Sequence, residues 1–431
     1  MKGNILVFLE TLFFLPRSCR LTSVLPRIFF VSLFFVMAGS ELCAFTAQTT
    51  HMKDGKVIRV GPTRELKVPS EAAKIAKDGD TIEIDAAEYR GDVALWIQNN
   101  LTIKGVNGRP HLIADGKHIQ GKSIWITRGK NITIENIEFS GTRVRDKNGA
   151  GIRHEGQGLV LRSCFFHNNE NGILTGHNPL DEILIEYCEF ANNGLGKSGY
   201  THNIYIGRAR RFAIRFSNIH HVKHGQQVKS RASENYIFFN RIMDEKDGKG
   251  SRAIDLPNGG KSFVVGNVLQ QSVFSENRSF IGFAHERGVI YKNSSLRILN
   301  NTFVNEAPSG TLVWSKPEYA ILVANNIFLG VGDISNISVK QKTNLRLGNY
   351  GTLMKLIMSS KDYGFAAPDN YDFRLTAASP AVDAGTDLRH FGLASKLLNG
   401  QYGAGARGEA RSKINKIDIG AFEYVKEGAK Q

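Results

Sequence analysis

Ile132-Thr-Ile-Glu-Asn-Ile-Glu-Phe139 is followed by two stretches of the same pattern, Leu159-Val-Leu-Arg-Ser-Cys-Phe-Phe166 and Ile183-Leu-Ile-Glu-Tyr-Cys-Glu-Phe190. Their alternating apolar residues are typical of a strand with one face turned inward. The pattern continues in segments that end at Ile219, Ile242, Leu269, Phe303 and Phe328. Successive ends are 27, 24, 29, 23, 27, 34 and 25 residues apart. Such a repeat predicts a solenoid built from one coil per repeat.

A second column lies two residues before the first and runs Ile137, Cys164, Cys188, Ser217, Asn240, Asn267, Asn301, Asn326. One coil is too short to bury its own apolar face, so coils stack about 4.8 Å apart and pair their backbones with neighbouring coils. Like residues then form ladders, Phe on Phe and Asn on Asn. We therefore expect an all-β parallel β-helix. Cys164 and Cys188 fall on adjacent rungs, and two buried thiols are favoured there over a disulfide.

The flanking segments are expected to close this solenoid. Pro69–Lys77 has helical spacing with Ser70 as its cap, which predicts a short N-terminal capping helix over the first coil. Residues 371–385 and 418–423 are expected to close the far end. The domain prediction is a signal peptide at 1–44, the β-helix at 45–330, and terminal coils with a C-terminal closing segment at 331–431.

The first 44 residues have the composition of an export signal. Two apolar runs, 5–15 and 28–38, flank Arg17, Arg20 and Arg27. The second run is too short to span a bilayer comfortably, and small or polar residues follow it. We expect a secreted or periplasmic protein with no stable membrane span after signal removal. A retained N-terminal anchor is the alternative.

The chain is strongly basic. Its formal charge is +15, and residues 1–44 contribute four basic and two acidic side chains, so +13 remains on the rest. A basic surface attracts polyanions. If the protein is exported, an acidic polysaccharide is the expected partner and nucleic acid is not. The sequence also contains no recognisable nucleic-acid-binding motif. The alternative is a positive surface that only aids solubility.

Several segments together resemble the secreted right-handed parallel β-helix proteins of the pectate-lyase-like superfamily. They are the Asn and Phe ladders, Gly-Asp-Thr-Ile-Glu-Ile at 79–84, and the motifs at 373–385 and 418–423. The resemblance covers roughly residues 55–425. It implies a right-handed β-helix but specifies function poorly, because this fold hosts lyases, hydrolases, epimerases and non-catalytic surface proteins.

Each coil also has a third strand, which can be aligned from coil to coil by its inward-facing residue. The outer face of this strand carries the candidate catalytic and binding side chains. The next residues along point outward: Arg153, Leu174, Tyr205, Lys229, Asp255, Gly282. Arg231 also faces outward, and Asn203 and Gln227 precede the inward column. The neighbouring turns add His202, Lys223 and His224. A groove along stacked strands suits an extended sugar chain.

These residue types match what a uronate lyase needs: a base for the C5 proton, a cation for the adjacent carboxylate, and an acid for the leaving oxygen. Lys229 is the candidate base if Arg231 and Arg153 lower its pKa. Arg231 or Arg153 would bind the carboxylate, and Tyr205 or His224 would be the acid. The predicted catalytic residues are thus Lys229, Arg231, Tyr205 and His224. The predicted substrate-binding residues are Arg153, Asn203, Gln227, Asp255, His202 and Lys223.

Residues 228–240, which begin Val-Lys-Ser-Arg, resemble a segment of the alginate lyase and chondroitin B lyase family. The resemblance implies that Lys229 is the base. The family's Arg on the next coil is missing, because residues 253–259 read Ala-Ile-Asp-Leu-Pro-Asn-Gly. Its calcium-binding Glu pair is also missing, because residues 222–227 read Val-Lys-His-Gly-Gln-Gln. We therefore expect no cofactor, with calcium as the alternative.

The histidines at 220, 221 and 224 do not predict a metal site. Their spacing lacks a standard zinc pattern, and strand alternation would turn His220 and His221 apart. The leading hypothesis is a monomeric lyase of an acidic glycan. The alternatives are a non-catalytic glycan-binding or envelope structural protein, and a uronate C5-epimerase.

Overall fold

The computed structural model describes residues 55–196, 200–286, 288, 291–348, 363–391, 399–412 and 415–425. The expected signal peptide at 1–44 lies outside these residues. The described residues all belong to one compact unit that begins at Gln48. Within them, no helix has the length and apolar character needed to cross a membrane.

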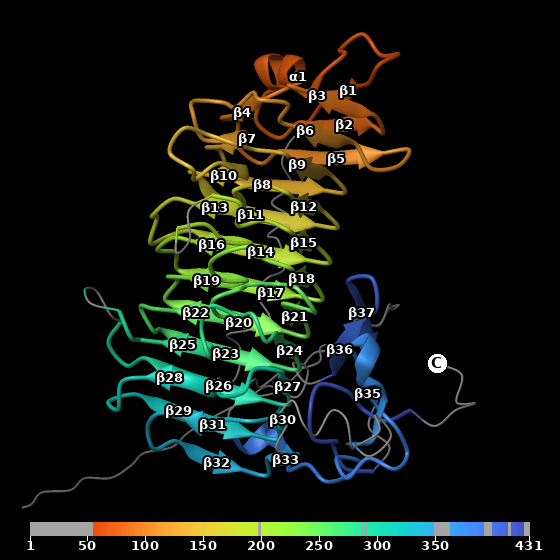
Figure 1. Ribbon diagram of the computed structural model, residues 1–431. Coiled ribbons are helices and arrows are strands. Elements are labelled where there is room, and N and C mark those ends of the chain that lie inside the picture. Colours follow the sequence, from red (N-terminus) through yellow and green to blue (C-terminus); the bar gives the residue numbers. More distant parts are fainter. Residues whose placement is uncertain are drawn as a thin grey trace, which may run out of the picture. The chain divides into compact units, whose positions relative to one another are not determined.

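The chain folds as a right-handed parallel β-helix, as predicted (Figure 1). Three parallel sheets run along it, and each coil from β2 to β31 contributes one strand to each sheet in the order A, B, C, whereas the first coil contributes only β1 and the last only β32 and β33. Sheet A contains β1 (Val57–Val60), β2 (Thr81–Asp85), β5 (Thr102–Val106), β8 (Lys130–Glu135), β11 (Gln157–Arg162), β14 (Glu182–Glu186), β17 (Arg211–Arg215), β20 (Glu234–Phe238), β23 (Lys261–Val265), β26 (Ser295–Leu299), β29 (Ala320–Ala324) and β32 (Lys340–Lys342).

Sheet B contains β3 (Glu88–Arg90), β6 (His111–Ile113), β9 (Glu138–Ser140), β12 (Phe165–His167), β15 (Glu189–Ala191), β18 (Asn218–His220), β21 (Arg241–Met243), β24 (Val268–Gln271), β27 (Thr302–Asn305), β30 (Ile327–Gly330) and β33 (Leu345–Leu347). Sheet C contains β4 (Ala94–Trp96), β7 (Ser123–Thr127), β10 (Ala150–His154), β13 (Asn171–Thr175), β16 (Ile204–Ile206), β19 (Val228–Ser230), β22 (Ile254–Leu256), β25 (Ser279–Phe283), β28 (Thr311–Ser315) and β31 (Asp333–Ser335). The stack thus reaches Leu347.

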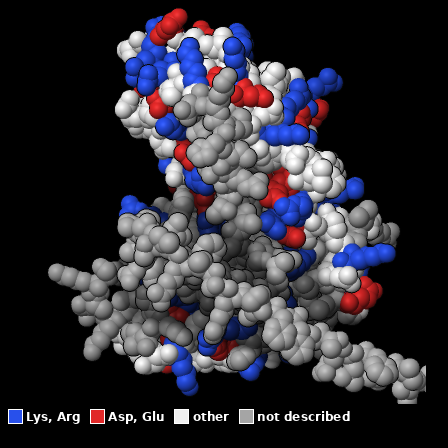
Figure 2. All heavy atoms as spheres, turned by 180° about the vertical axis from the view of Figure 1, so that it is seen from behind, with Lys and Arg blue, Asp and Glu red and all other residues white. Residues whose placement is uncertain are grey.

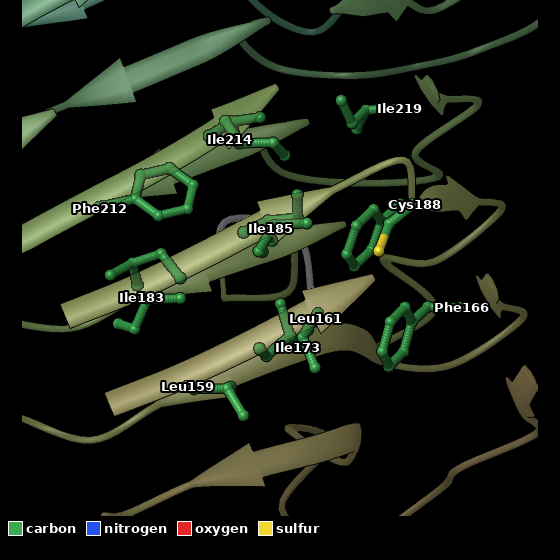
Figure 3. Packing of buried hydrophobic residues seen from close by; sticks show 14 of the residues in the cluster. Leu159, Leu161, Phe166, Ile173, Ile183, Ile185, Cys188, Phe212, Ile214 and Ile219 are labelled. Atoms are coloured by element: carbon green, nitrogen blue, oxygen red, sulfur yellow. The ribbon is translucent and has the colours of Figure 1, made fainter. Parts of the chain in front are cut away.

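The register of the strands confirms the repeat. Phe139, Phe166 and Phe190 are direct partners on β9, β12 and β15, and the column continues in register to Phe328. The Phe166 ring is stacked between its two neighbours, with centroids 5.0 and 4.8 Å away. Figure 3 shows the sheet A side of the same core, where Leu159, Ile183 and Phe212 lie in register. Continuous apolar burial along the solenoid axis holds the coils together.

The asparagine column forms a buried hydrogen-bonded ladder. The side-chain amide of Asn240 donates to Asn267 Oδ1 at 3.0 Å, Asn267 donates to Asn301 at 3.0 Å, and Asn301 donates to Asn326 at 3.0 Å. Each Oδ1 also accepts the backbone N–H of the preceding rung. Cys164 and Cys188, on earlier rungs, are buried free thiols, as expected.

The N-terminal helix is shorter than predicted and differently capped. Helix α1 spans Pro69–Ile75, with Val68 at the cap position. Ser70 lies inside the helix, where its backbone N–H donates to Asp92. The Glu71 carboxylate accepts the Lys67 N–H at 2.6 Å instead. Pro69 explains the shift, because its fixed φ and missing N–H suit the first helical position.

The described part of the C-terminal segment packs along the outer face of sheet B, whereas the sequence predicted that residues 371–385 and 418–423 close the far end of the solenoid. Its described residues contain two antiparallel strand pairs, β34 (Phe365–Ala367) with β35 (Asp372–Leu375) and β36 (Gly400–Gly403) with β37 (Arg407–Ala410), and two 3-10 turns, η2 (Pro368–Asn370) and η3 (Leu388–Phe391). Phe373 and Phe422 join one apolar cluster with outward-facing Val268 and Leu329 of sheet B. These apolar outer positions explain the placement, since they would otherwise be exposed to water.

Candidate functional site

The outer face of sheet C carries the predicted row of side chains. Tyr205, Lys229 and Asp255 are direct partners on β16, β19 and β22. Leu174 separates Tyr205 from Arg153 in the same row, and Gly282 and Trp314 continue it beyond Asp255. The row is fixed by the inward Ile and Val residues that precede it. Residues about two dozen positions apart in sequence therefore lie one coil apart in space.

Lys229 is the centre of an ionic network. Its Nζ lies 3.3 Å from Asp255 Oδ2 and 3.2 Å from Glu286 Oε1. The other oxygen of Glu286 lies 2.7 Å from Arg231 Nη2. We call Tyr205, Lys229, Arg231, Asp255 and Glu286 the sheet C cluster. The sequence had predicted cationic neighbours for Lys229, but its ionic partners are two carboxylates.

Arg231 is held in place from several sides. Its Nε donates to the Tyr205 hydroxyl at 3.0 Å, and its Nη1 donates to Asn258 Oδ1 at 2.6 Å. The Tyr291 hydroxyl donates to its backbone carbonyl at 2.9 Å. A guanidinium fixed in this way has a defined orientation toward a planar anion.

Asp255 lies beneath the surface of the cluster and is 1% exposed, so its predicted direct contact with substrate is corrected to a supporting position. It accepts a hydrogen bond from His285 at 2.7 Å and lies 3.4 Å from Arg252. Burial raises the pKa of Asp255, but the His285 hydrogen bond and the charge of Lys229 outweigh it and lower this pKa to about 2. A negative charge is thus fixed under Lys229.

His202 is buried against the same cluster. Its ring stacks on Tyr205 with centroids 5.5 Å apart, and its Nδ1 accepts the Gln226 backbone N–H at 3.1 Å. Burial, together with the charge of Lys229, lowers the pKa of His202 to about 3. A neutral, 2% exposed ring supports Tyr205 from below, so the predicted direct contact of His202 with substrate is also corrected.

Asn203 and Gln227 lie inside the coils, so their predicted place on the substrate surface is wrong. Asn203 Nδ2 donates to Gln227 Oε1 at 2.6 Å, and Gln227 Nε2 donates to Asp244 Oδ1 at 2.9 Å. Asn193 donates to Asn203 Oδ1 at 2.8 Å. They form a second buried polar ladder at the turn before sheet C, where every amide needs an internal partner.

His224 and Lys223 lie in the turn before β19. The His224 ring bonds to the Glu276 carboxylate at 2.8 Å, two coils further along. The backbone N–H of Lys223 donates to Asn193. No contact among the described residues links either side chain to Lys229, so the structure does not bring His224 into the sheet C cluster.

Arg153 lies at the N-terminal end of the row in a separate basic group. Glu155 Oε1 lies 3.6 Å from Arg153 Nε and 2.6 Å from Lys122 Nζ, and its other oxygen lies 2.9 Å from Arg128. One carboxylate is thus shared by three cations, which leaves an excess of positive charge that an anionic chain could neutralise. Arg153 lies two rungs before Tyr205 and three before Lys229, and its ion-pair partner is Glu155 rather than a residue of the sheet C cluster.

Three residues near the sheet C cluster could not be predicted from the sequence repeat. His285 and Glu286 follow β25 in a turn, and Asn258 follows β22. Trp314 occupies the outward row and is 41% exposed. An exposed aromatic ring at this position offers an apolar face to a ligand. Extending the inward column to Val313 would have found Trp314, whereas turn residues have no fixed period.

The residues around Lys229 do not fit a calcium ion. Residues 222–227 supply no carboxylate. Asp255 and Glu286 are already paired with Lys229. Calcium prefers several carboxylate and carbonyl oxygens without a competing ammonium.

On the face drawn in Figure 2, Lys and Arg side chains are interspersed with Asp and Glu. A cavity of about 480 Å³ lies elsewhere, between sheet B and the C-terminal segment, lined by residues that include Arg241, Glu245, Tyr402 and Phe422. This cavity is separate from the sheet C cluster, in which Lys229 is largely buried and the Arg231 and Glu286 side chains are partly exposed.

The comparisons with known proteins identify the fold. A crystal structure of pectate lyase Pel9A is similar over 86% of this chain and 97% of its own, with a TM-score of 0.58 and 14% identity. The chain has the pectate lyase fold. An alginate lyase from Paenibacillus sp. matches over 65% of this chain and 96% of its own with a TM-score of 0.41 and 13% identity. No protein-family model matches the sequence, and no curated protein is significantly similar to it.

Proposed function

We propose that this protein binds an acidic, uronate-containing polysaccharide along the outer face of sheet C and cleaves it by β-elimination. The observation that carries the proposal is the sheet C cluster, in which an amine, a guanidinium and a phenol meet on adjacent coils. The pectate lyase fold and the basic surface support it. The protein is proposed to act outside the cytoplasm as a monomer.

In this proposal Arg231 binds the uronate carboxylate through its forked donors. The incoming carboxylate replaces Glu286, which removes one of the two anions bonded to the Lys229 ammonium. Lys229 then loses its ammonium proton to solvent, and the neutral amine removes the C5 proton of the sugar. The electron pair forms the C4–C5 double bond while the C4–O bond breaks, and Tyr205 protonates the leaving oxygen.

Tyr205 is suited to this role by its hydrogen bonding. Its oxygen accepts from Arg231 Nε at 3.0 Å, so its own hydrogen is directed elsewhere. The positive guanidinium also stabilises the phenolate that remains after proton transfer. His202 and Arg231 hold the ring on two sides.

One observation favours a non-catalytic glycan-binding protein as the second candidate. In the free protein Lys229 and Arg231 are both ion-paired with carboxylates. The same two cations would bind a uronate carboxylate without any chemical step.

Incubation with alginate, pectate, chondroitin and heparan chains distinguishes these functions, with ultraviolet absorbance reporting the unsaturated product. A lyase gives an absorbance rise that Lys229→Ala abolishes and that Lys130→Ala, at an exposed position of sheet A, retains. Chelation of calcium should leave the rise unchanged. Binding without a rise would support the second candidate, and altered sugar composition without cleavage would indicate C5 epimerisation.

A further inference from the structure

Two imidazoles and a carboxylate converge on the outer face of sheet B, away from the sheet C cluster. His111 Nε2 lies 3.4 Å from Glu138 Oε1, and His167 Nε2 lies 2.8 Å from the same oxygen. The three ligand atoms all lie within 4.8 Å of one another. Each of the three side chains is about one-fifth exposed, so an ion can reach the group from solvent. Most of each side chain is buried, which limits its movement.

The stacked coils fix this geometry. His111 and Glu138 are direct partners on β6 and β9, and His167 ends β12 on the next coil (Figure 1). His167 is also stacked on Phe165, with centroids 4.4 Å apart. Three adjacent strands of one sheet therefore present the three groups, and little side-chain freedom is lost when they bind a common ligand.

The charge of Glu138 is available for a cation. Its carboxylate pairs with the two imidazoles, and no Lys or Arg among the described residues forms an ion pair with it. A second group, His220, His221 and Glu245, differs in this respect, because Glu245 lies 2.7 Å from Arg241. The guanidinium already neutralises that carboxylate, so the first group is the better cation site.

We propose that His111, Glu138 and His167 bind one divalent transition-metal ion of the zinc class, which links three successive coils. Imidazole nitrogen with one carboxylate oxygen is a ligand set that zinc-class ions prefer and calcium does not. Bonds of about 2.0–2.1 Å in a tetrahedron place ligand atoms about 3.4 Å apart. The His111–Glu138 separation of 3.4 Å already has this value, and the His167–Glu138 pair opens when the ion replaces its hydrogen bond.

The surrounding groups can accept the change in protonation. Metal binding at His167 Nε2 moves the ring proton to Nδ1, which lies 3.0 Å from the Asn168 side-chain amide. Turning that amide presents its oxygen to accept the Nδ1 hydrogen, and metal-bound imidazoles usually donate their other ring N–H to such an acceptor. His111 Nε2 exchanges its 2.7 Å hydrogen bond with the Ser140 hydroxyl for the metal bond, which frees this hydroxyl to accept a hydrogen bond from a water ligand.

The test is zinc titration of the purified, chelator-treated protein, followed by calorimetry and by the unfolding temperature. The unaltered protein is expected to bind one more zinc ion than each of the variants His111→Ala, His167→Ala and Glu138→Gln. Zinc should also raise the unfolding temperature of the unaltered protein. Cobalt should give the visible absorption of a four-coordinate site. His220→Ala is the matched control and should retain this ion. Glu138→Gln preserves the side-chain shape, so it separates ligand loss from misfolding.

Absence of zinc binding by the unaltered protein would overturn the proposal. So would binding that all three variants retain, or binding that is lost only in His220→Ala. Circular dichroism of each variant establishes that it is folded before its zinc content is compared.

Discussion

The Glu286 carboxylate lies 2.7 Å from the Arg231 guanidinium, and its second oxygen lies 3.2 Å from the Lys229 ammonium. An internal carboxylate thus bridges the two cations that the proposed function assigns to a uronate. Burial raises the pKa of Glu286, but the charges of Lys229 and Arg231 outweigh it and hold this pKa below its usual value. Glu286 is therefore an anion at neutral pH and competes with an anionic ligand for the same donors.

Replacing Glu286 by Gln should strengthen binding of an acidic glycan. The amide keeps the size of the side chain but removes the competing charge, so affinity should rise about tenfold for a gain of about 1.4 kcal/mol. Isothermal titration with oligouronates measures it. Glu276→Gln, which alters a carboxylate bonded to His224, is the control and should have no effect. Equal or weaker binding by Glu286→Gln would show that Glu286 does not compete.

Replacing Tyr205 by Phe should lower the rate of cleavage while binding is retained. The ring still stacks on His202, but the proton donor is lost, and general acid catalysis contributes about 10²–10⁴-fold. Initial rates across substrate concentrations separate kcat from KM. His224→Ala should retain activity, because His224 bonds to Glu276 outside the cluster. A Tyr205→Phe protein of full activity would exclude Tyr205 as the acid.

The row on sheet C could be predicted because inward residues repeat. Ile204, Val228 and Ile254 must point into the core, so the next residues Tyr205 and Lys229 must point outward. The same alternation failed at the turns. His220 and His221 were expected to point apart, but His221 adopts a φ of +50°, and their Nδ1 atoms lie 2.6 Å apart. A left-handed residue breaks the alternation on which the prediction depended.

Glu286 could not be found by this reasoning. It lies 57 residues after Lys229 in a turn, and turn lengths vary from coil to coil. Asn203 and Gln227 failed for a related reason, because a polar residue beside a strand can point into the turn and bond internally. Periodicity predicts which strand residues share a face, but it does not predict which turn residues fold over that face.

Replacing Asn267 by Leu should destabilise the central coils. Asn267 donates to Asn301 Oδ1 and accepts from the side chain of Asn240, each at 3.0 Å. The variant leaves buried amide groups without partners, at a cost of about 1–3 kcal/mol each. The unfolding temperature should fall by about 5 °C. Lys130→Ala, at an exposed position of β8, is the control. An unchanged unfolding temperature would show that the ladder is not required for stability.

Acid should destabilise the protein partly through His202. Burial lowers the pKa of His202 to about 3 in the folded protein, whereas an unfolded histidine titrates near about 6.5. Below about pH 6.5 the unfolded chain binds a proton that the folded protein does not, so this contribution to stability is lost as pH falls toward about 3. His202→Gln should therefore show a smaller fall in unfolding temperature between about pH 7 and pH 4 than the unaltered protein. His118→Gln is the matched control, since the exposed His118 also accepts a backbone N–H through Nδ1. If both variants followed the pH profile of the unaltered protein, His202 would not be a source of the acid sensitivity.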